Sequence, residues 1–305
     1  MNNKWLIVIA GPTAIGKTAI AIDIAQHYNT AVLSADSRQC YKEMQIGTAV
    51  PSKEELAMVP HYFIQSHSIL EPLNAAAYEK YALETLDALF KKHDVVVVCG
   101  GTGLYINALC NGIDIMPETD STIIASIQHQ YDIHGLEWLQ NECKTKDPEF
   151  WEQAEQQNPT RLIRALAFHE TNNTSITNYK TGIKKTRPFN IIKIRLEMDR
   201  ALLYYRINQR VENMLEEGLL NEVLQLKVHK DLKNLQTVGY AEFYQHPHFP
   251  NFNQIDLNQI KEKIQQHTRN YAKRQITWFK NDVSFISFDA QDKDRILNYL
   301  HQQIQ

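Results

Sequence analysis

The sequence predicts an α/β fold in which a parallel sheet carries helices on both faces and an all-helical domain is inserted. Two observations support this prediction. Apolar runs of strand length, such as 5–10 and 94–99, recur between segments with helical periodicity, and continuous β-branched runs are typical of strands buried in a parallel sheet. The segment 121–182, by contrast, is polar and contains no convincing strand, which indicates a helical insertion.

The elements can be placed in order along the chain. Strands are expected at 5–10, 31–35, 94–99, 191–196 and 283–288. Apolar positions at three- and four-residue spacing predict helices at 75–92, 121–131, 135–144, 148–155, 159–170, 199–217, 218–228 and 257–279. The return from the insertion comes near Pro188, because proline disfavours helix in the residue before it. We therefore expect a core domain of 1–117 and 184–305 and an insertion domain of 118–183.

The composition indicates a soluble globular protein. The 305 residues are 43% hydrophobic and 22% charged, with a net charge of −3, which argues against a uniformly basic nucleic-acid binder. No apolar run is long enough to span a bilayer, and the N-terminus lacks a signal-peptide pattern. The four cysteines are scattered, so we expect reduced thiols, no zinc site and a cytoplasmic protein without a membrane partner. We expect it to be a monomer.

A glycine-rich motif follows the first expected strand. It fits the pattern G-x-x-x-x-G-K-[ST] and consists of Gly11, Pro12, Thr13, Ala14, Ile15, Gly16, Lys17 and Thr18. A buried-looking helix follows, so the context is that of a phosphate-binding loop in a P-loop NTPase-like sheet. We expect these residues to bind a polyphosphate, with Lys17 reaching its terminal phosphate and the Thr18 hydroxyl holding Mg²⁺. The alternative is a glycine turn with a lysine present by chance.

Asp36 directly follows the second expected strand. In an open parallel sheet, ligands bind beyond the carboxyl ends of the strands, so this carboxylate should lie on the same edge as the phosphate loop. An ionised carboxylate can accept a proton or hold a metal. The alternative is an aspartate that only caps a helix or stabilises a turn.

The strand at 94–99 ends in Cys99 and then in the glycine-rich segment 100–105, which includes Thr102. A P-loop ATPase or GTPase usually has an acidic residue there to hold Mg²⁺ and direct water. No such acid is present in this sequence. The glycines are expected to let a ligand lie close to the backbone beside the Thr102 hydroxyl, and the alternative is a plain turn.

Two basic clusters lie in the predicted helices. Arg161 and Arg164 are three residues apart and share one helix face. The segment 261–280 holds six Lys or Arg residues and one acidic residue, in a chain that is acidic overall. In that segment, a core-facing stripe is expected from Ile260, Ile264, Tyr271, Ile276 and Phe279, with Arg269, Lys273 and Lys280 on the opposite face. Such a face suits phosphate-backbone contact, although a solvated helix face is the alternative.

Together these motifs resemble those of the bacterial tRNA dimethylallyltransferases, also called isopentenyltransferases. The matching segments occur in order over nearly the whole chain. They are 11–18, 36–39, 41–44, 46–49, 100–105, 159–165, 238–240 and 268–279. The phosphate loop alone is common to many families, whereas the ordered set is specific.

The resemblance implies transfer of a dimethylallyl group from dimethylallyl diphosphate to N6 of adenosine 37, 3′ of the anticodon, in tRNAs that read codons beginning with U. It implies Mg²⁺ as cofactor, held by Thr18. By resemblance, Asp36 takes the proton from N6, Thr102 supports the amine and the donor, and Lys17 is the third catalytic residue. The missing acid after Cys99 agrees with this reaction, because no water attacks phosphorus.

The resemblance also implies contacts with the tRNA anticodon stem-loop, over which the insertion would close. The implied tRNA-binding residues are Asp36, Ser37, Arg38, Gln39, Thr102, Thr160, Arg161, Leu162, Ile163, Arg164, Gln236, Gly239, Tyr240, Thr268, Arg269, Lys273, Arg274 and Gln275. The chain departs from the family at Ile124 and Gln236, where other members carry Arg, and at Asn270, which interrupts a frequent Arg pair. No tRNA contact is carried over to Ile124.

Three other functions are alternatives to this one. A P-loop nucleotide kinase or ATPase explains the loop but not the missing acid or the ordered motifs. A prenyltransferase acting on free AMP or ADP shares the donor chemistry, but the insertion and the basic helix favour a macromolecular acceptor. An RNA-binding module without activity does not account for the intact Lys17, Thr18 and Asp36.

Overall fold

The computed structural model describes residues 3–71 and 73–304. The described residues divide into two compact units. The first consists of Met1–Asn111 and Thr186–Gln305, and the second of Gly112–Lys185. The predicted insertion, 118–183, falls inside the second unit. Each unit has its own apolar core and is described by itself below.

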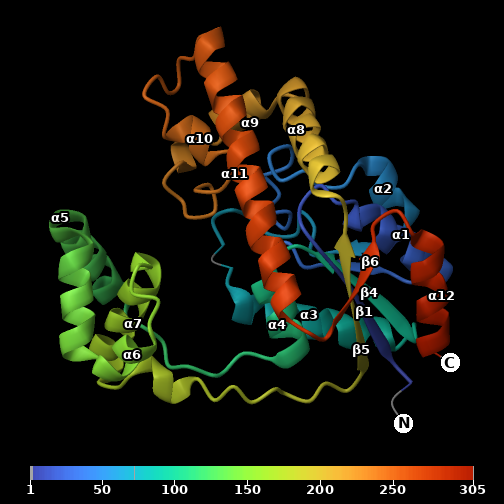
Figure 1. Cartoon of the computed structure of the whole chain (residues 1–305), viewed down its shortest axis with the longest axis horizontal. Helices are drawn as coiled ribbons and strands as arrows, with labels where there is room; N and C mark the ends of the chain where they lie inside the picture. Colours follow the sequence, from blue (N-terminus) through green and yellow to red (C-terminus); the bar gives the residue numbers. More distant parts are fainter. Residues whose placement is uncertain (1–2, 72, 305) are drawn as a thin grey trace. The chain divides into compact units, whose positions relative to one another are not determined.

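The first unit is built on a six-stranded sheet in which every pairing is parallel, as predicted (Figure 1). The strand order is β3-β2-β4-β1-β5-β6. The strands are β1 (Trp5–Ala10), β2 (Val32–Ser34), β3 (His61–Tyr62), β4 (Val95–Gly100), β5 (Asn190–Glu197) and β6 (Phe285–Asp289). Only β3 was missed from the sequence, because two residues are too few to show a pattern.

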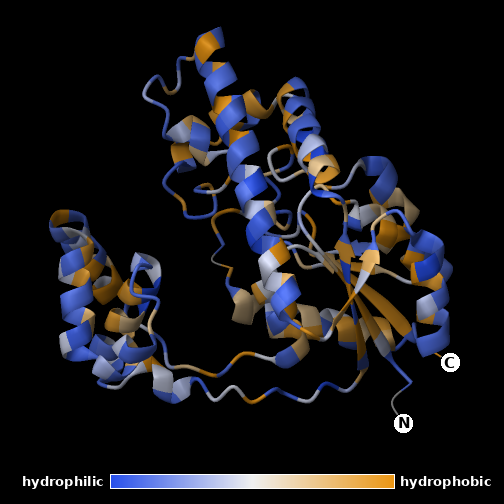
Figure 2. Ribbon diagram, viewed as in Figure 1, coloured by the Kyte–Doolittle hydropathy of each residue, from blue (hydrophilic) through white to orange (hydrophobic). Residues whose placement is uncertain are grey.

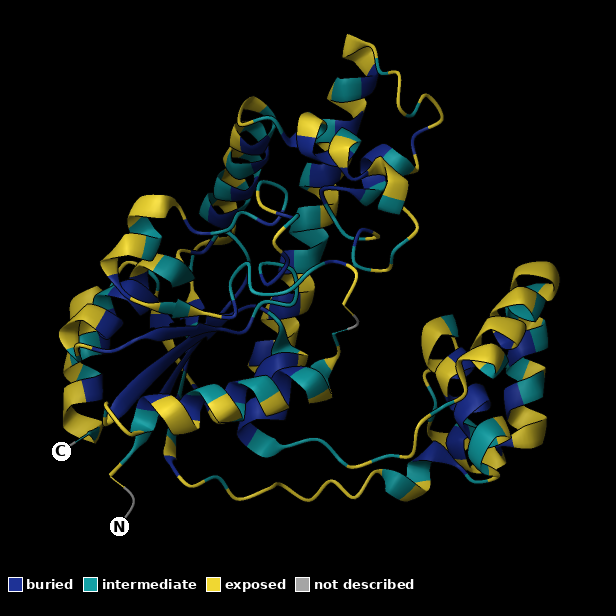
Figure 3. Ribbon diagram, turned by 180° about the vertical axis from the view of Figure 1, so that it is seen from behind, coloured by how far each residue is buried: buried dark blue, intermediate teal, exposed yellow. Residues whose placement is uncertain are grey.

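Both faces of the sheet are covered, since alternate side chains of a strand point to opposite faces. In β1, Leu6 and Val8 belong to one apolar cluster, whereas Ile7 and Ile9 belong to another. Figures 2 and 3 show the central strands as hydrophobic and buried. The helices of this unit are α1 (Lys17–His27), α2 (Lys53–Met58), α3 (Ala75–Phe90), α4 (Gly103–Asn111), α8 (Arg200–Glu216), α9 (Leu219–Gln225), α10 (Ala241–Tyr244), α11 (Gln254–Asn281) and α12 (Lys293–Gln303).

The predicted apolar stripe of α11 is partly wrong. Ile276 is 42% exposed, and Tyr271 is half-buried at the wall of a cavity described below. The predicted stripe mixed two helix faces, since Ile276 directly follows Gln275, which is buried on the core side. The residues that α11 buries are Asp256, Ile260, Ile264, Ala272, Gln275 and Phe279.

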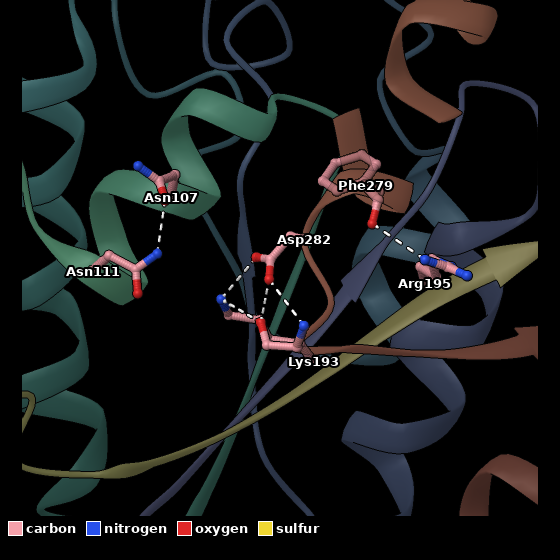
Figure 4. Close-up of polar contacts among 7 residues, drawn as sticks. Asn107, Asn111, Lys193, Arg195, Phe279 and Asp282 are labelled. Atoms are coloured by element: carbon pink, nitrogen blue, oxygen red, sulfur yellow. Dashed lines mark hydrogen bonds and ion pairs between the residues drawn. The ribbon is translucent and has the colours of Figure 1, made fainter. Parts of the chain in front are cut away.

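The C-terminal end of α11 is fastened to β5 (Figure 4). The guanidinium of Arg195 donates to the carbonyl oxygen of Phe279 at 3.4 Å. Nζ of Lys193, a side chain only 9% exposed, lies 3.1 Å from Asp282. Desolvation raises the pKa of Asp282, but the Ser284 hydrogen bonds and the Lys193 charge outweigh it, so this pKa lies below its usual value. These contacts hold α11 at a fixed position on the sheet.

The second unit is helical, with α5 (Ser121–Lys146), α6 (Pro148–Gln153), α7 (Pro159–Asn172) and the 3₁₀ helix η1 (Ile176–Tyr179). Gly135, at φ 75°, interrupts α5 at the point where two separate helices were predicted. The apolar core of this second unit includes Leu162 and Ile163, which are 0% and 6% exposed. The side chains of these two residues pack inside the unit, so the predicted tRNA contact would have to involve their backbone.

Candidate active site

The phosphate loop lies between β1 and α1, as expected. Gly16 adopts a left-handed conformation, φ 103°, and α1 begins at Lys17. Nζ of Lys17 donates to the carbonyl oxygen of Pro12 at 2.8 Å, which holds the ammonium inside the loop. Desolvation lowers the pKa of Lys17 from 10.5 to about 8, although the Asp36 carboxylate acts in the opposite direction. The loop therefore presents a poorly hydrated cation that gains from an anionic ligand.

Two arginines of α8 face this loop and were not singled out from the sequence. The guanidinium of Arg206 donates to the carbonyl oxygen of Ile15 at 3.3 Å. Arg210, one helical turn later, donates to the carbonyl oxygen of Thr48 at 3.3 Å. Desolvation lowers the pKa of Arg210, while Asp36 raises it. In the sequence, the four-residue spacing indicates only that the two arginines share one face of a helix. It does not indicate which part of the protein that face packs against.

A cavity of about 800 Å³ opens beside the loop. It is lined by loop residues with Lys17 and Thr18, by Asp36, and by Arg210 from α8. Three basic or hydroxyl side chains around one cavity suit a polyphosphate. The donor set also fits Mg²⁺, since the Thr18 hydroxyl is a hard oxygen ligand beside the expected diphosphate.

Asp36 is placed by a turn after β2. Its Oδ1 accepts hydrogen bonds from the backbone N–H groups of Arg38, at 2.9 Å, and Gln39, at 3.2 Å. The turn-stabilising interpretation is thus correct for one oxygen. The second oxygen has no hydrogen-bond partner in the described part of the chain. The Thr102 hydroxyl accepts from the N–H of Ser37 at 3.0 Å, so it supports the same turn.

A second cavity, of about 320 Å³, also has Asp36 in its lining. It shares four lining residues with the first cavity, namely Thr13, Asp36, Arg210 and Tyr271. Three segments far apart in the sequence supply the predicted residues that line it. These are Asp36, Ser37, Arg38, Gln236, Gly239, Thr268 and Arg274. The structure therefore brings the predicted phosphate loop and most of the predicted acceptor residues of this unit to one carboxylate.

Tyr271 is a site residue that the sequence placed in the core instead. Desolvation raises the pKa of Tyr271 to about 12, and the charge of Asp36 adds to the effect. Its hydroxyl therefore stays protonated and can act as a hydrogen-bond donor at neutral pH. The guanidinium carbon of the exposed Arg274 lies 5.7 Å from the centre of its ring.

Two glycines after β4, Gly101 and Gly103, make room for side chains of α11, whereas Gly100 lines the first cavity. A Cβ at Gly101 would collide with Gln275, and one at Gly103 would collide with the ring of Trp278. Gln275 uses this close approach to bridge two loops. Its amide donates to the Gly101 oxygen at 2.9 Å and accepts from the N–H of Thr13 at 2.9 Å. Gln275 is 5% exposed and lines the first cavity, so its side chain positions the phosphate loop.

Other predicted tRNA contacts differ in exposure. Tyr240 is 0% exposed and its hydroxyl donates to Glu222 at 2.6 Å, so its side chain is part of the core. Lys273 on α11 is exposed, whereas Arg269 is half-buried and donates to Asn208 at 2.7 Å. The amide of Gln39 donates to the oxygens of Thr48 and Ala49. In the second unit, α7 exposes Thr160, Arg161 and Arg164.

Comparisons with known proteins identify the family of this chain. The model of the IPP transferase family matches residues 39–282. The chain is 41% identical over 304 residues to tRNA dimethylallyltransferase 1 of Bacteroides fragilis, and the match covers 100% of both chains. This chain belongs to the tRNA dimethylallyltransferase family. It is 42% identical to the family member of Cytophaga hutchinsonii, over 99% of this chain and 98% of that one.

Solved structures support the same family. The full-length tRNA isopentenylpyrophosphate transferase from Bacillus halodurans superposes with a TM-score of 0.72 and 29% identity, over 99% of this chain and 97% of that chain. The resemblance, the α/β fold and the enzyme class predicted from the sequence are thus confirmed. All four cysteines are buried free thiols, as expected. Among the described residues, no helix has the length and apolar character needed to cross a bilayer.

Proposed function

We propose that this chain transfers the dimethylallyl group from dimethylallyl diphosphate to N6 of adenosine 37, next to the anticodon, in tRNAs that read codons beginning with U. The observation that carries the proposal is the position of Asp36, which lines both the cavity of the phosphate loop and the second cavity. A donor in the first cavity and an adenine in the second would meet at this carboxylate.

The basic side chains of the first cavity would hold the diphosphate as a leaving group. The bond between the allylic carbon and the diphosphate oxygen breaks, and a bond from N6 to that carbon forms. Negative charge then develops on pyrophosphate, where Lys17 and Arg210 lie close to the loop. Mg²⁺ held by Thr18 would supply further charge stabilisation when bound. The exocyclic amine loses one proton, which Asp36 accepts through the oxygen that the turn leaves free.

The second cavity would receive the adenine, extracted from the anticodon loop. Single-stranded loops present bases that can be splayed out, stacked on aromatic rings and hydrogen-bonded at their edges. Tyr271 offers a ring and a hydroxyl there, and Arg274 offers a cation at the rim. A nucleotide kinase would account for the loop, but it would not require a carboxylate between two cavities. The exposed Lys273 and α7 arginines favour tRNA over a free nucleotide as acceptor.

Asp36→Asn tests this proposal, because asparagine keeps the oxygen that accepts the two backbone hydrogen bonds and removes the base. A general base typically contributes about 10²–10⁴-fold, so single-turnover transfer should slow by that factor. The affinity for tRNA, measured by filter binding, should change by less than threefold. Asp87→Asn, at an exposed helix position, is the matched control and should leave both values unchanged. A loss of rate below tenfold in Asp36→Asn would remove Asp36 from this role.

A further inference from the structure

We propose that the segment joining α10 to α11 carries a site for a divalent transition metal such as Zn²⁺, formed by His246, His248 and Asp256. The two histidines lie in the loop that follows α10, and Asp256 lies in the first turn of α11. One ligand atom from each residue lies within 4.8 Å of the other two. The site is separate from the phosphate loop and plays no part in the transfer reaction argued above.

The distances between ligand atoms are close to those of a tetrahedral metal. Nδ1 of His248 lies 3.0 Å from Oδ1 of Asp256, and Nε2 of His246 lies 3.9 Å from the same oxygen. With metal–ligand bonds of about 2.0–2.1 Å, two ligands of a tetrahedral Zn²⁺ are about 3.3–3.4 Å apart. All three ligand atoms lie within 4.8 Å of one another, so side-chain shifts of about 1–1.5 Å would bring them to bonding distance of one ion.

Two of the three ligands are buried, and a buried polar atom without a partner is costly. His246 and Asp256 have side chains that are only 6% exposed, and no hydrogen bond reaches Nε2 of His246 among the described residues. His248 is 60% exposed, so an ion and a water ligand can enter from that side. The set of two imidazoles and one carboxylate suits Zn²⁺ with an open fourth position.

The surrounding contacts orient the carboxylate. Oδ2 of Asp256 accepts the backbone N–H of Asn253 at 2.9 Å, as part of the capping box of α11, which leaves Oδ1 directed at the histidines. The N–H of His248 also lies 3.3 Å from Nδ1 of His246. A neutral imidazole has one lone pair, so an ion bound through Nε2 would replace this long hydrogen bond.

The bound ion would join two elements that form the acceptor cavity. Residues 236–239, which line that cavity, directly precede α10, and α11 contributes Thr268, Tyr271 and Arg274. An ion bound between the end of α10 and the start of α11 would stabilise this wall, because it would limit the movement of both segments. The ion would therefore have a structural role, whatever acceptor the enzyme uses.

The test is a Zn²⁺ titration of chelator-treated full-length protein against a competing dye, with millimolar Mg²⁺ present throughout. The proposal predicts one high-affinity equivalent per chain and a rise in the thermal midpoint on binding. His248→Gln and Asp256→Asn should each weaken binding at least about 100-fold, since loss of even an outer partner of a metal ligand costs 10–100-fold. His301→Gln, at another exposed histidine, should bind as the wild type does.

Co²⁺ gives a second measurement that does not depend on the dye. A single Co²⁺ at this site should show the intense visible absorption of four-coordinate geometry, and His248→Gln should abolish it. The unfolding midpoint of metal-free His248→Gln should equal that of the metal-free wild type, because the side chain is exposed. Absence of a Zn²⁺ equivalent below 100 µM, or equal binding by both ligand variants, would overturn the proposal. Neither outcome bears on tRNA prenylation.

Discussion

Glu222→Gln is the substitution that most directly tests how the walls of the two cavities are held. Glu222 lies in α9 and is 9% exposed. Its Oε2 accepts from the N–H groups of Gln45 and Ile46, at 2.9 and 2.8 Å. Its Oε1 accepts from the N–H of Gly47 at 3.0 Å and from the Tyr240 hydroxyl at 2.6 Å. One carboxylate thus satisfies four donors, and the 45–47 segment lines both cavities.

The magnitude follows from the four donors. A glutamine keeps Oε1 for Gly47 and Tyr240, but its amide group then faces the N–H groups of Gln45 and Ile46. Two part-buried donors lose their acceptor, at roughly 1–2 kcal/mol each, in the lower part of the range for buried donors, so we expect a loss of about 2–4 kcal/mol in the free energy of unfolding. Desolvation raises the pKa of Tyr240, and Glu222 raises it further, so the tyrosine stays protonated and does not compensate.

Urea unfolding monitored by fluorescence and circular dichroism measures this loss. Glu216→Gln is the matched control, because Glu216 is exposed on α8 and should change the free energy of unfolding by less than about 0.5 kcal/mol. We also expect Glu222→Gln to raise KM for tRNA, since the acceptor cavity loses a fixed wall. A variant within 0.5 kcal/mol of the wild type would refute the reasoning that this carboxylate fastens the 45–47 segment.

Two further predictions concern charge at the site. Because the pKa of Lys17 is lowered to about 8, its ammonium group is charged below that pH and neutral above it. We therefore expect kcat/KM for the donor to fall as the pH rises from 7.5 to 9.5. Lys17→Arg should remove this pH dependence. A flat profile in the wild type would contradict it. Lys273→Ala with Arg274→Ala should weaken tRNA binding and lower the salt slope by about 1–2 units, whereas Lys293→Ala on α12 should not. An unchanged salt slope in the double variant would indicate that this face of α11 is only solvated and does not contact tRNA.

The sequence predicted the parts of the fold that depend on local patterns. The strand runs and the phosphate loop could be placed because a buried strand and a glycine motif are visible within a few residues. Asp36 was placed at the correct sheet edge, because the carboxyl ends of parallel strands share that edge.

The parts that it missed depend on which helix face meets which neighbour. Arg206 and Arg210 sit on an ordinary amphipathic helix, and only the packing of α8 brings them to the phosphate loop. Tyr271 was assigned to the core because it falls in the predicted apolar stripe of α11, although in this chain it lines a cavity. Leu162 matched a tRNA-binding motif by position, but its side chain is buried in the second unit. A motif identifies a segment, and burial then decides which of its side chains can reach a ligand.

Nucleoside mass analysis tests the central claim most directly. The purified chain is incubated with dimethylallyl diphosphate, Mg²⁺ and unmodified tRNA, and the tRNA is digested and analysed together with parallel reactions on AMP, ADP and ATP. The account predicts adenosine carrying one dimethylallyl group, located 3′ of the anticodon, with pyrophosphate released in equal amount. Prenylation of the free nucleotides without that of tRNA, or phosphoryl transfer from ATP in place of prenylation, would contradict it.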